Sequence, residues 1–210
     1  MAELLDIYDE AGRHIGTEDR NVVHAKGLWH RTVHCWLARG GNIIFQRRGS
    51  NLDNNPGKLY TTASGHIAAG ETLEAAFARE IKEELGVGIE SPIKTGEGKW
   101  TGDFKKTDGT DFHDRVFWTC FVAKTDVPLD RFRPQSEELD GLVEMDMRET
   151  LRLFGGAVDS IPATGYMQNG DGVFKLRDLT VTRPDFLLNP GETLEDKYDN
   201  IIRKILENLG

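Results

Sequence analysis

The stretch from Gly65 to Val87, GHIAAGETLEAAFAREIKEELGV, constrains the fold more than any other part of the chain. Within it an apolar residue recurs at every fourth position, at Leu73, Phe77, Ile81 and Leu85. This period predicts an amphipathic helix over 72–85 that packs by one face. Gly86 follows the last apolar position, where a helix commonly ends. The chain must therefore offer this helix a buried apolar surface.

The predicted helix carries three glutamates, Glu80, Glu83 and Glu84, within little more than one turn. Their spacing of i, i+3 and i+4 places them in one patch, and each like-charged pair costs about 0.2 to 0.5 kcal/mol. An ordinary solvated acidic face, tempered by Lys82, is one interpretation. The other is a divalent cation among the carboxylates, because oxygen ligands suit Mg²⁺ or Mn²⁺.

The overall composition excludes several classes of protein. The chain has 210 residues, 38% hydrophobic and 29% charged, which is typical of a globular domain. A net charge of -9 opposes binding of a nucleic acid polymer by charge attraction. The N-terminus lacks the features of a signal peptide and no apolar run is long enough to span a membrane, so we expect no membrane association. Cys35 and Cys120 sit in apolar segments and are expected to be reduced core residues of a cytoplasmic protein.

Segments rich in β-formers alternate with helical patterns along the chain, which predicts an α/β or α+β fold with a mixed sheet covered by helices. We expect a single domain over 1–210. Its ends are read as an N-terminal hairpin extension over 1–28 and a C-terminal helix over 190–210. Residues 155–189, rich in glycine, proline and polar residues, are read as an irregular insertion with at most a short hairpin near 173–181.

Nine positions in the stretch from Gly65 to Val87 fill every defined place in the pattern G-x5-E-x7-R-E-U-x-E-E-x-G-U, where U is an apolar aliphatic residue. They are Gly65, Glu71, Arg79, Glu80, Ile81, Glu83, Glu84, Gly86 and Val87. A chance match in a chain of this length is on the order of one in a million. The stretch resembles the Nudix box, the signature of Nudix hydrolases. The resemblance is sharp over 65–87 and extends from about 29 to 154.

The resemblance implies a loop-helix-loop motif in a Nudix-type α/β/α sandwich. It also implies Mg²⁺- or Mn²⁺-dependent hydrolysis of a nucleoside diphosphate linked to another group, so the expected partner is a small-molecule diphosphate. In that family the metal ligands would correspond to Glu80, Glu83, Glu84 and the backbone carbonyl of Gly65. Glu71 and Arg79 would correspond to the pair that shapes the catalytic motif.

Hydrolysis of a phosphoanhydride also needs a carboxylate that orients or deprotonates water, and cations that hold phosphate. Glu83 and Glu138, the latter in SEELDGL, are both candidates for the carboxylate, although Glu138 is equally readable as a solvated loop acid. Arg47, Arg48 and Lys58 are candidates for phosphate binding, with ordinary surface cations as the alternative.

Histidines precede and begin the box, among them His24, His30 and His66. The segments GLWHRTVHCWLA and TTASGH resemble the isopentenyl-diphosphate isomerase branch of the Nudix fold, in which histidines and later glutamates build a second metal site. The catalytic cysteine of those isomerases corresponds to Ser64 here, and FHDRVF stands where glutamates are expected. The histidines therefore suggest an altered metal site or ordinary structural roles.

Three functions remain open: a hydrolase, an isomerase-like enzyme and a nucleotide-binding module without catalysis. The complete set of box carboxylates favours the hydrolase. Dimerisation through the N-terminal hairpin or the last helix is a further hypothesis.

Overall fold

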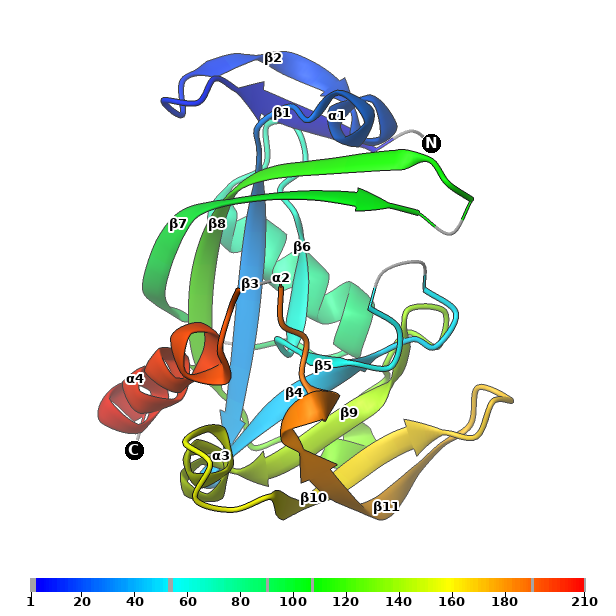
Figure 1. Ribbon diagram of the computed structural model, residues 1–210, viewed down its shortest axis with the longest axis vertical. Helices are drawn as coiled ribbons and strands as arrows, with labels where there is room; N and C mark the ends of the chain where they lie inside the picture. The colour runs from blue at the N-terminus through cyan, green and yellow to red at the C-terminus, as the bar shows by residue number, and fades with distance from the viewer. Residues whose placement is uncertain (1–2, 53–54, 90, 107, 190, 210) are drawn as a thin grey trace.

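The structure is a computed structural model that describes residues 3–52, 55–89, 91–106, 108–189 and 191–209 (Figure 1). Its strands are β1 (Leu4–Tyr8), β2 (His14–Asp19), β3 (His30–Arg39), β4 (Asn42–Arg48), β5 (Leu59–Tyr60), β6 (Ala63–His66), β7 (Ile93–Lys105), β8 (Asp111–Lys124), β9 (Leu139–Asp146), β10 (Ser160–Gln168) and β11 (Phe174–Thr182). Its α-helices are α1 (Arg20–Lys26), α2 (Leu73–Leu85), α3 (Met147–Phe154) and α4 (Asn200–Leu209). The predicted alternation of strands and helices is thus confirmed.

The strands form a small sheet of β1 and β2 and a large sheet in the order β11-β10-β9-β4-β3-β8-β7. β3 and β8 run parallel, whereas the other paired neighbours run antiparallel, so the large sheet is mixed. Short strand β6 pairs with β3, and β5 pairs with β4. The mixed sheet predicted from the sequence is confirmed.

Helices cover both faces of this sheet (Figure 1). The helix α2 packs on one face, where Phe77 and Ile81 join a core that includes Val33 of β3. The opposite face packs against α3 and α4, where Ile202 joins a core that includes Trp36 of β3. Residues of β3 point alternately to the two faces, as a strand requires. The sheet therefore separates two layers, and we call them the α2 face and the α4 face.

The boundaries of α2 follow from the two residues that cap it. The hydroxyl of Thr72 accepts a hydrogen bond from the Ala75 N–H and caps the start. Gly86 takes a left-handed conformation with φ of 69° and ends the helix. The helix predicted over 72–85 is confirmed.

Residues 155–189 differ from the expectation of an irregular insertion. The strands β10 and β11 pair along their whole length, and β10 also pairs with β9, so the hairpin extends the large sheet. Pro162 and Gly165 break the alternation of apolar residues in β10, and β11 is mostly exposed. A sheet edge that buries so little gives a weak sequence pattern.

The two ends of the chain agree with their predicted secondary structure in the described residues. β1 and β2 form the N-terminal hairpin, which α1 follows. At the C-terminus a π-helical turn over Glu195–Asp199 leads into α4. Cys35 and Cys120 are buried free thiols. In the described part of the chain, no helix is both long and apolar enough to cross a membrane.

Candidate functional site

Arg79 of α2 ties together the loop and helix of the motif. Its Nε and Nη2 each lie 2.9 Å from a carboxylate oxygen of Glu71, and Nη2 also donates to the carbonyl of His66 at 2.9 Å. Its Nη1 lies 2.7 Å from Glu80 Oε1 and 3.0 Å from Glu83 Oε2. The predicted pairing of Glu71 with Arg79 is therefore present. One guanidinium fixes the loop and also offsets the charge of two box glutamates.

Glu80 lies against the backbone of β6. A Cβ atom built on Gly65 would come within 2.0 Å of Glu80 Oε1, so only glycine leaves room for the carboxylate there. Burial raises the pKa of Glu80, and the Arg79 charge partly offsets this effect. The glycine of the motif thus brings a buried carboxylate and a backbone strand into contact.

Glu84 lies deeper than its neighbours. Its side chain receives a backbone hydrogen bond from Ser64, while its Oε2 is buried without a hydrogen-bond partner in the described residues. Burial raises the pKa of Glu84 well above its usual value, and the nearby Glu80 and Glu138 carboxylates add to the rise. A buried oxygen with no partner, among like charges, is the arrangement that a bound cation would satisfy.

The remaining acids lie at the rim of this group. The side chain of Glu83 is 56% exposed, and Glu138 is exposed on the loop before β9. The carbonyl of Glu138 accepts a hydrogen bond of 2.7 Å from the Gly49 N–H, which ties this loop to the end of β4. Both carboxylates can therefore reach water near the buried pair.

The three predicted phosphate-binding cations do not lie together. Burial lowers the pKa of Arg48, whereas its interactions with the charges of Glu84 and Glu138 raise it, so Arg48 lies beside the glutamates. Arg47 points to the other face of β4, with Nη2 3.8 Å from Asp185. Lys58 Nζ donates to the Pro184 carbonyl at 2.6 Å. Of these cations, the structure brings Arg48 to the box glutamates.

A second group of candidate ligands lies on the opposite face of β6. His24 of α1, His30 of β3 and His66 of β6 each offer a ligand atom, and these atoms lie within 4.8 Å of one another. His24 and His30 are buried, and His66 is partly buried. We call these three residues the histidine cluster. The sequence suggested their grouping, and the structure brings them together.

Hydrogen bonds fix the orientation of two of these rings. His24 Nδ1 lies 2.8 Å from the Arg20 carbonyl, and His30 Nδ1 lies 3.1 Å from the Leu28 carbonyl. A carbonyl oxygen can only accept, so each Nδ1 carries the hydrogen and each Nε2 keeps its lone pair. Burial lowers the pKa of His24 to about 4 and that of His30 to about 3. Both rings are therefore neutral at pH 7, as metal ligation requires.

Asp114 of β8 completes this cluster, and the sequence interpretation missed it. Its Oδ1 lies 3.5 Å from His30 Nε2 and 3.8 Å from His24 Nε2. Both Asp114 Oδ1 and His30 Nε2 are buried without a hydrogen-bond partner in the described residues. The segment FHDRVF contained the signal for this contact. Asp114 lies between His113 and Arg115, so its side chain points to the opposite side of the strand from theirs.

Comparison with known proteins agrees with this geometry. The family model described as NUDIX domain matches residues 28–161. An uncharacterized Nudix hydrolase of Clostridium acetobutylicum is 35% identical over 179 residues, which cover 81% of this chain and 82% of that protein. The chain belongs to the Nudix family.

Two further similarities cover parts of this Nudix protein. An isopentenyl-diphosphate Delta-isomerase of Mycolicibacterium vanbaalenii is 39% identical over 90 residues, which span 42% of this chain and half of the isomerase. A crystal structure of a Deinococcus radiodurans protein aligns with a TM-score of 0.55 at 21% identity, covering 73% of this chain and 90% of that one. The structural match supports the fold alone.

Neighbouring residues of β6 serve the two groups of candidate ligands in this Nudix domain. Gly65 lies against Glu80 on the α2 face, and His66 belongs to the histidine cluster. Ser64, which stands in the place of the cysteine of the isomerases, pairs with His34 of β3. The histidines of the isomerase resemblance are therefore assembled, but a hydroxyl stands where the thiol would be.

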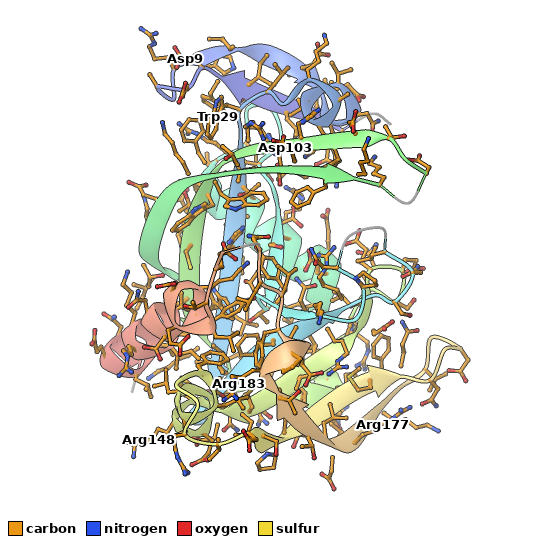
Figure 2. The ribbon with its side chains drawn as sticks, viewed as in Figure 1. Asp9, Trp29, Asp103, Arg148, Arg177 and Arg183 are labelled. Carbon is orange, nitrogen blue, oxygen red and sulfur yellow. The ribbon has the colours of Figure 1, made fainter. Side chains whose placement is uncertain are left out.

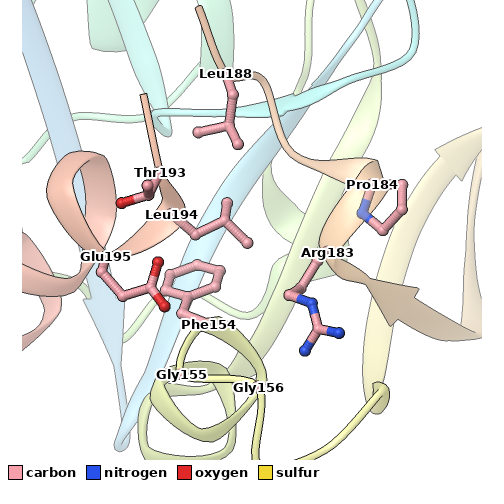
Figure 3. A pocket seen from close by; sticks show the side chains of 9 residues that line it. All are labelled: Phe154, Gly155, Gly156, Arg183, Pro184, Leu188, Thr193, Leu194 and Glu195. Atoms are coloured by element: carbon pink, nitrogen blue, oxygen red, sulfur yellow. The ribbon is translucent and has the colours of Figure 1, made fainter. Parts of the chain in front are cut away.

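A hollow of the Nudix protein at the end of α3 is lined by none of these candidate ligands (Figure 3). It has a volume of about 620 Å³ and lies at the end of α3, with Phe154, Arg183 and Glu195 in its lining. The guanidinium of Arg183 already lies 3.3 Å from the carbonyls of Leu153 and Val158. Both contacts are made by its Nη1, and the lining of the hollow contains one acid, Glu195, and no histidine.

Proposed function

We propose that this chain is a metal-dependent Nudix hydrolase that cleaves the phosphoanhydride bond of a nucleoside diphosphate linked to another group. The observation that carries the proposal is the packing of Glu80 against Gly65 beside the buried, unpartnered Oε2 of Glu84. Family membership supports hydrolysis in general, and these residues suggest where it occurs. We infer that residues 1–210 form one domain built around this motif.

The proposed metal ligands are Glu80, Glu83, Glu84 and the Gly65 carbonyl, with Mg²⁺ or Mn²⁺ as the ion. Their oxygen donors, and the excess of negative charge left after Arg79 is counted, fit a hard divalent cation. Such an ion, when bound, neutralises phosphate oxygens and lowers the pKa of an attacking water. Neutralisation of the buried carboxylates would also remove their mutual repulsion.

The residues of the chain itself supply the other requirements. Glu83 and Glu138 are the proposed carboxylates that orient or deprotonate water, because both are exposed beside the buried pair. Arg48 is the proposed phosphate-binding cation, because it lies beside Glu84 and Glu138. Glu71 and Arg79 hold the loop and helix in the geometry that these groups need.

A second ion is proposed at Nε2 of His24 and His30, a ring nitrogen of His66 and Asp114 Oδ1. Three imidazoles and one carboxylate suit Mn²⁺ or Zn²⁺ better than Mg²⁺. The unpartnered His30 Nε2 and Asp114 Oδ1 support this assignment. Because the histidines are part of the resemblance to the isomerases, this site supports an isomerase-like enzyme as the second candidate function.

Product release from a panel of substrates tests the hydrolase. Nucleotide sugars, dinucleotides, nucleoside triphosphates and non-nucleotide diphosphates are incubated with Mg²⁺ or Mn²⁺. We expect at least one class to be hydrolysed, and Glu83→Gln to lower kcat by about 10² to 10³-fold. Glu74→Gln, a change of an exposed glutamate on the same helix, is the matched control and should keep full activity. An unaltered rate in Glu83→Gln would remove that residue from the mechanism.

The alternatives give different results in the same preparation. Hydrogen isotope exchange into isopentenyl diphosphate without phosphate release would identify the isomerase. Tight nucleotide binding with no turnover would identify a binding module. The serine at position 64 predicts no exchange, because an alcohol with an ordinary pKa does not do the acid-base work of a thiol.

A further inference from the structure

A cavity of about 530 Å³ lies beside the hairpin of β10 and β11, apart from both groups of candidate metal ligands. Its lining includes two arginines, Arg47 of β4 and Arg177 of β11, and two apolar side chains, Met167 and Leu179. Figure 2 shows Arg177 on the outer strand of the hairpin. Most of this hairpin follows the part of the chain that matches the family model, which ends at residue 161.

The floor of the cavity follows from the register of the strands. Arg47 of β4 is opposite Gly141 of β9, and Gly141 is opposite Met167 of β10. A Cβ atom on Gly141 would come within 2.4 Å of the Tyr166 carbonyl oxygen and 2.6 Å of Met167 Sδ, so only glycine fits there. The Arg47 guanidinium and the Met167 thioether thus lie on either side of Gly141, a strand position without a side chain.

Most of the groups in this cavity that can still form hydrogen bonds are donors. Arg47 Nε is buried and has no hydrogen-bond partner in the described residues, and its Nη2 reaches Asp185 only at 3.8 Å. Arg177 is exposed and contacts the side chain of Asn169. The carboxylate of Asp140 already accepts hydrogen bonds from Ser50 and Gln168. Two guanidinium groups with spare donors fit a phosphate or carboxylate.

The cavity is lined by sequence neighbours of two residues of the proposed hydrolytic site, Glu138 and Arg48. Ser136 and Asp140, both in its lining, flank Glu138 in the sequence. Arg47 precedes Arg48, which lies beside Glu84 on the other face of β4. The loop that carries Glu138 therefore also contributes residues to the cavity.

We propose that the cavity binds a second anionic group, a phosphate or a carboxylate, carried by the same substrate whose diphosphate lies at the box glutamates. The assignment to a substrate rests on the proposed hydrolase function. The anion site itself rests on Arg47, Arg177 and the apolar floor. The hairpin of β10 and β11 thereby selects substrates by a charge remote from the bond that is cleaved.

Matched ligands test this proposal without turnover. NADP⁺ and NAD⁺ share a diphosphate bridge and differ by one ribose phosphate, as do coenzyme A and its dephosphorylated form. Binding is measured by calorimetry with Mg²⁺ in the Glu83→Gln background, in which hydrolysis is expected to be slow. We expect the member with the extra phosphate to bind about tenfold more tightly in at least one pair. Equal affinities within both pairs would overturn the proposal.

Variants test whether the preference for the ligand with the extra phosphate arises in this cavity. Arg47→Gln and Arg177→Gln should each reduce the affinity ratio toward one, whereas Arg148→Gln, a change of an exposed arginine on α3, should preserve it. Circular dichroism and thermal unfolding confirm that each variant folds. A ratio that survives in both cavity variants would place the anion elsewhere.

Competition with inorganic phosphate distinguishes an anionic group carried by the substrate from a separate anionic effector. If the cavity serves the substrate, phosphate should compete with the ligand that carries the extra phosphate and leave its partner unaffected. Phosphate that instead accelerates hydrolysis without weakening either ligand would identify a separate effector and overturn the substrate assignment. Since the binding ratio needs no catalysis, failure of the anion site and failure of the hydrolase are separate results.

Discussion

The two groups of candidate metal ligands occupy opposite faces of one short strand, and they differ in chemistry. On the α2 face, carboxylates gather around Gly65, with Arg79 among them and Glu83 open to water. On the α4 face, neutral imidazoles gather around His66 in a drier setting. The first group repels itself and needs a cation, whereas the second can remain neutral. Strand alternation alone can thus separate a group of candidate carboxylate ligands from a group of candidate imidazole ligands.

The largest effect should come from the buried carboxylate on the α2 face. Glu84→Gln keeps the shape of the side chain but removes the charge, so we expect kcat to fall about 10³-fold. The same change relieves repulsion from Glu80 and Glu138, so the metal-free variant should be more stable by about 1 kcal/mol. Steady-state kinetics and urea unfolding in EDTA measure the two effects. Lost activity together with lost stability would indicate ordinary structural damage instead.

The next effect concerns the close approach of β6 to Glu80. Gly65→Ala adds a Cβ atom that would overlap the Glu80 carboxylate, so we expect kcat to fall about 10²-fold and stability to fall by about 2 kcal/mol. Gly88→Ala is the control, because a Cβ atom there meets nothing within 4 Å. Normal kinetics in Gly65→Ala would show that the position of Glu80 does not govern the chemistry.

On the α4 face, protonation of a half-buried imidazole should weaken the fold. Burial lowers the pKa of His34 from 6.5 to about 4, with the Lys197 charge contributing in the same direction. As pH falls through 6.5, the unfolded chain binds a proton that the folded chain does not bind until near pH 4. This contribution to stability is therefore complete above pH 6.5 and is lost progressively between pH 6.5 and 4.

Urea unfolding at pH 7 and pH 4.5 measures that loss. We expect His34→Gln to lose about 2 kcal/mol less than the unaltered protein between the two pH values. His14→Gln, a change of an exposed histidine on β2, should behave like the unaltered protein. Parallel curves for all three proteins would mean that His34 does not titrate differently on folding.

The smallest effect on catalysis should come from the histidine cluster itself. His66→Gln removes one proposed ligand, so bound Mn²⁺ or Zn²⁺ should fall from about two ions per chain to about one, while kcat falls less than about tenfold. Metal content after dialysis and hydrolysis rates measure both. A loss as large as that in Glu84→Gln would make the two faces one catalytic unit.

Sequence reasoning succeeded where a function depends on local spacing. The pairing of Glu71 with Arg79 lies within one loop-helix-loop unit, and the period of α2 fixes which side chains share a face. The limits of α2 followed in the same way from Thr72 and Gly86. Contacts inside one contiguous motif do not depend on how distant strands align.

Sequence reasoning failed where the outcome depends on strand register. Arg47 and Arg48 are adjacent, yet alternation sends Arg48 to the glutamates and Arg47 to the cavity beside Met167. Asp114 joins the histidines only because β8 aligns in parallel with β3. The hairpin of β10 and β11 buries too little for a clear pattern. Register follows from the packing of the whole sheet, and a single sequence does not display it.

The most direct test of the central claim is the position of manganese in crystals. Crystals soaked in Mn²⁺ with a non-hydrolysable diphosphate analogue should show anomalous peaks among Glu80, Glu83 and Glu84, with the analogue bridging toward Arg48. Analogue bound with no peak among these carboxylates, or a peak confined to the histidine cluster, would contradict the account.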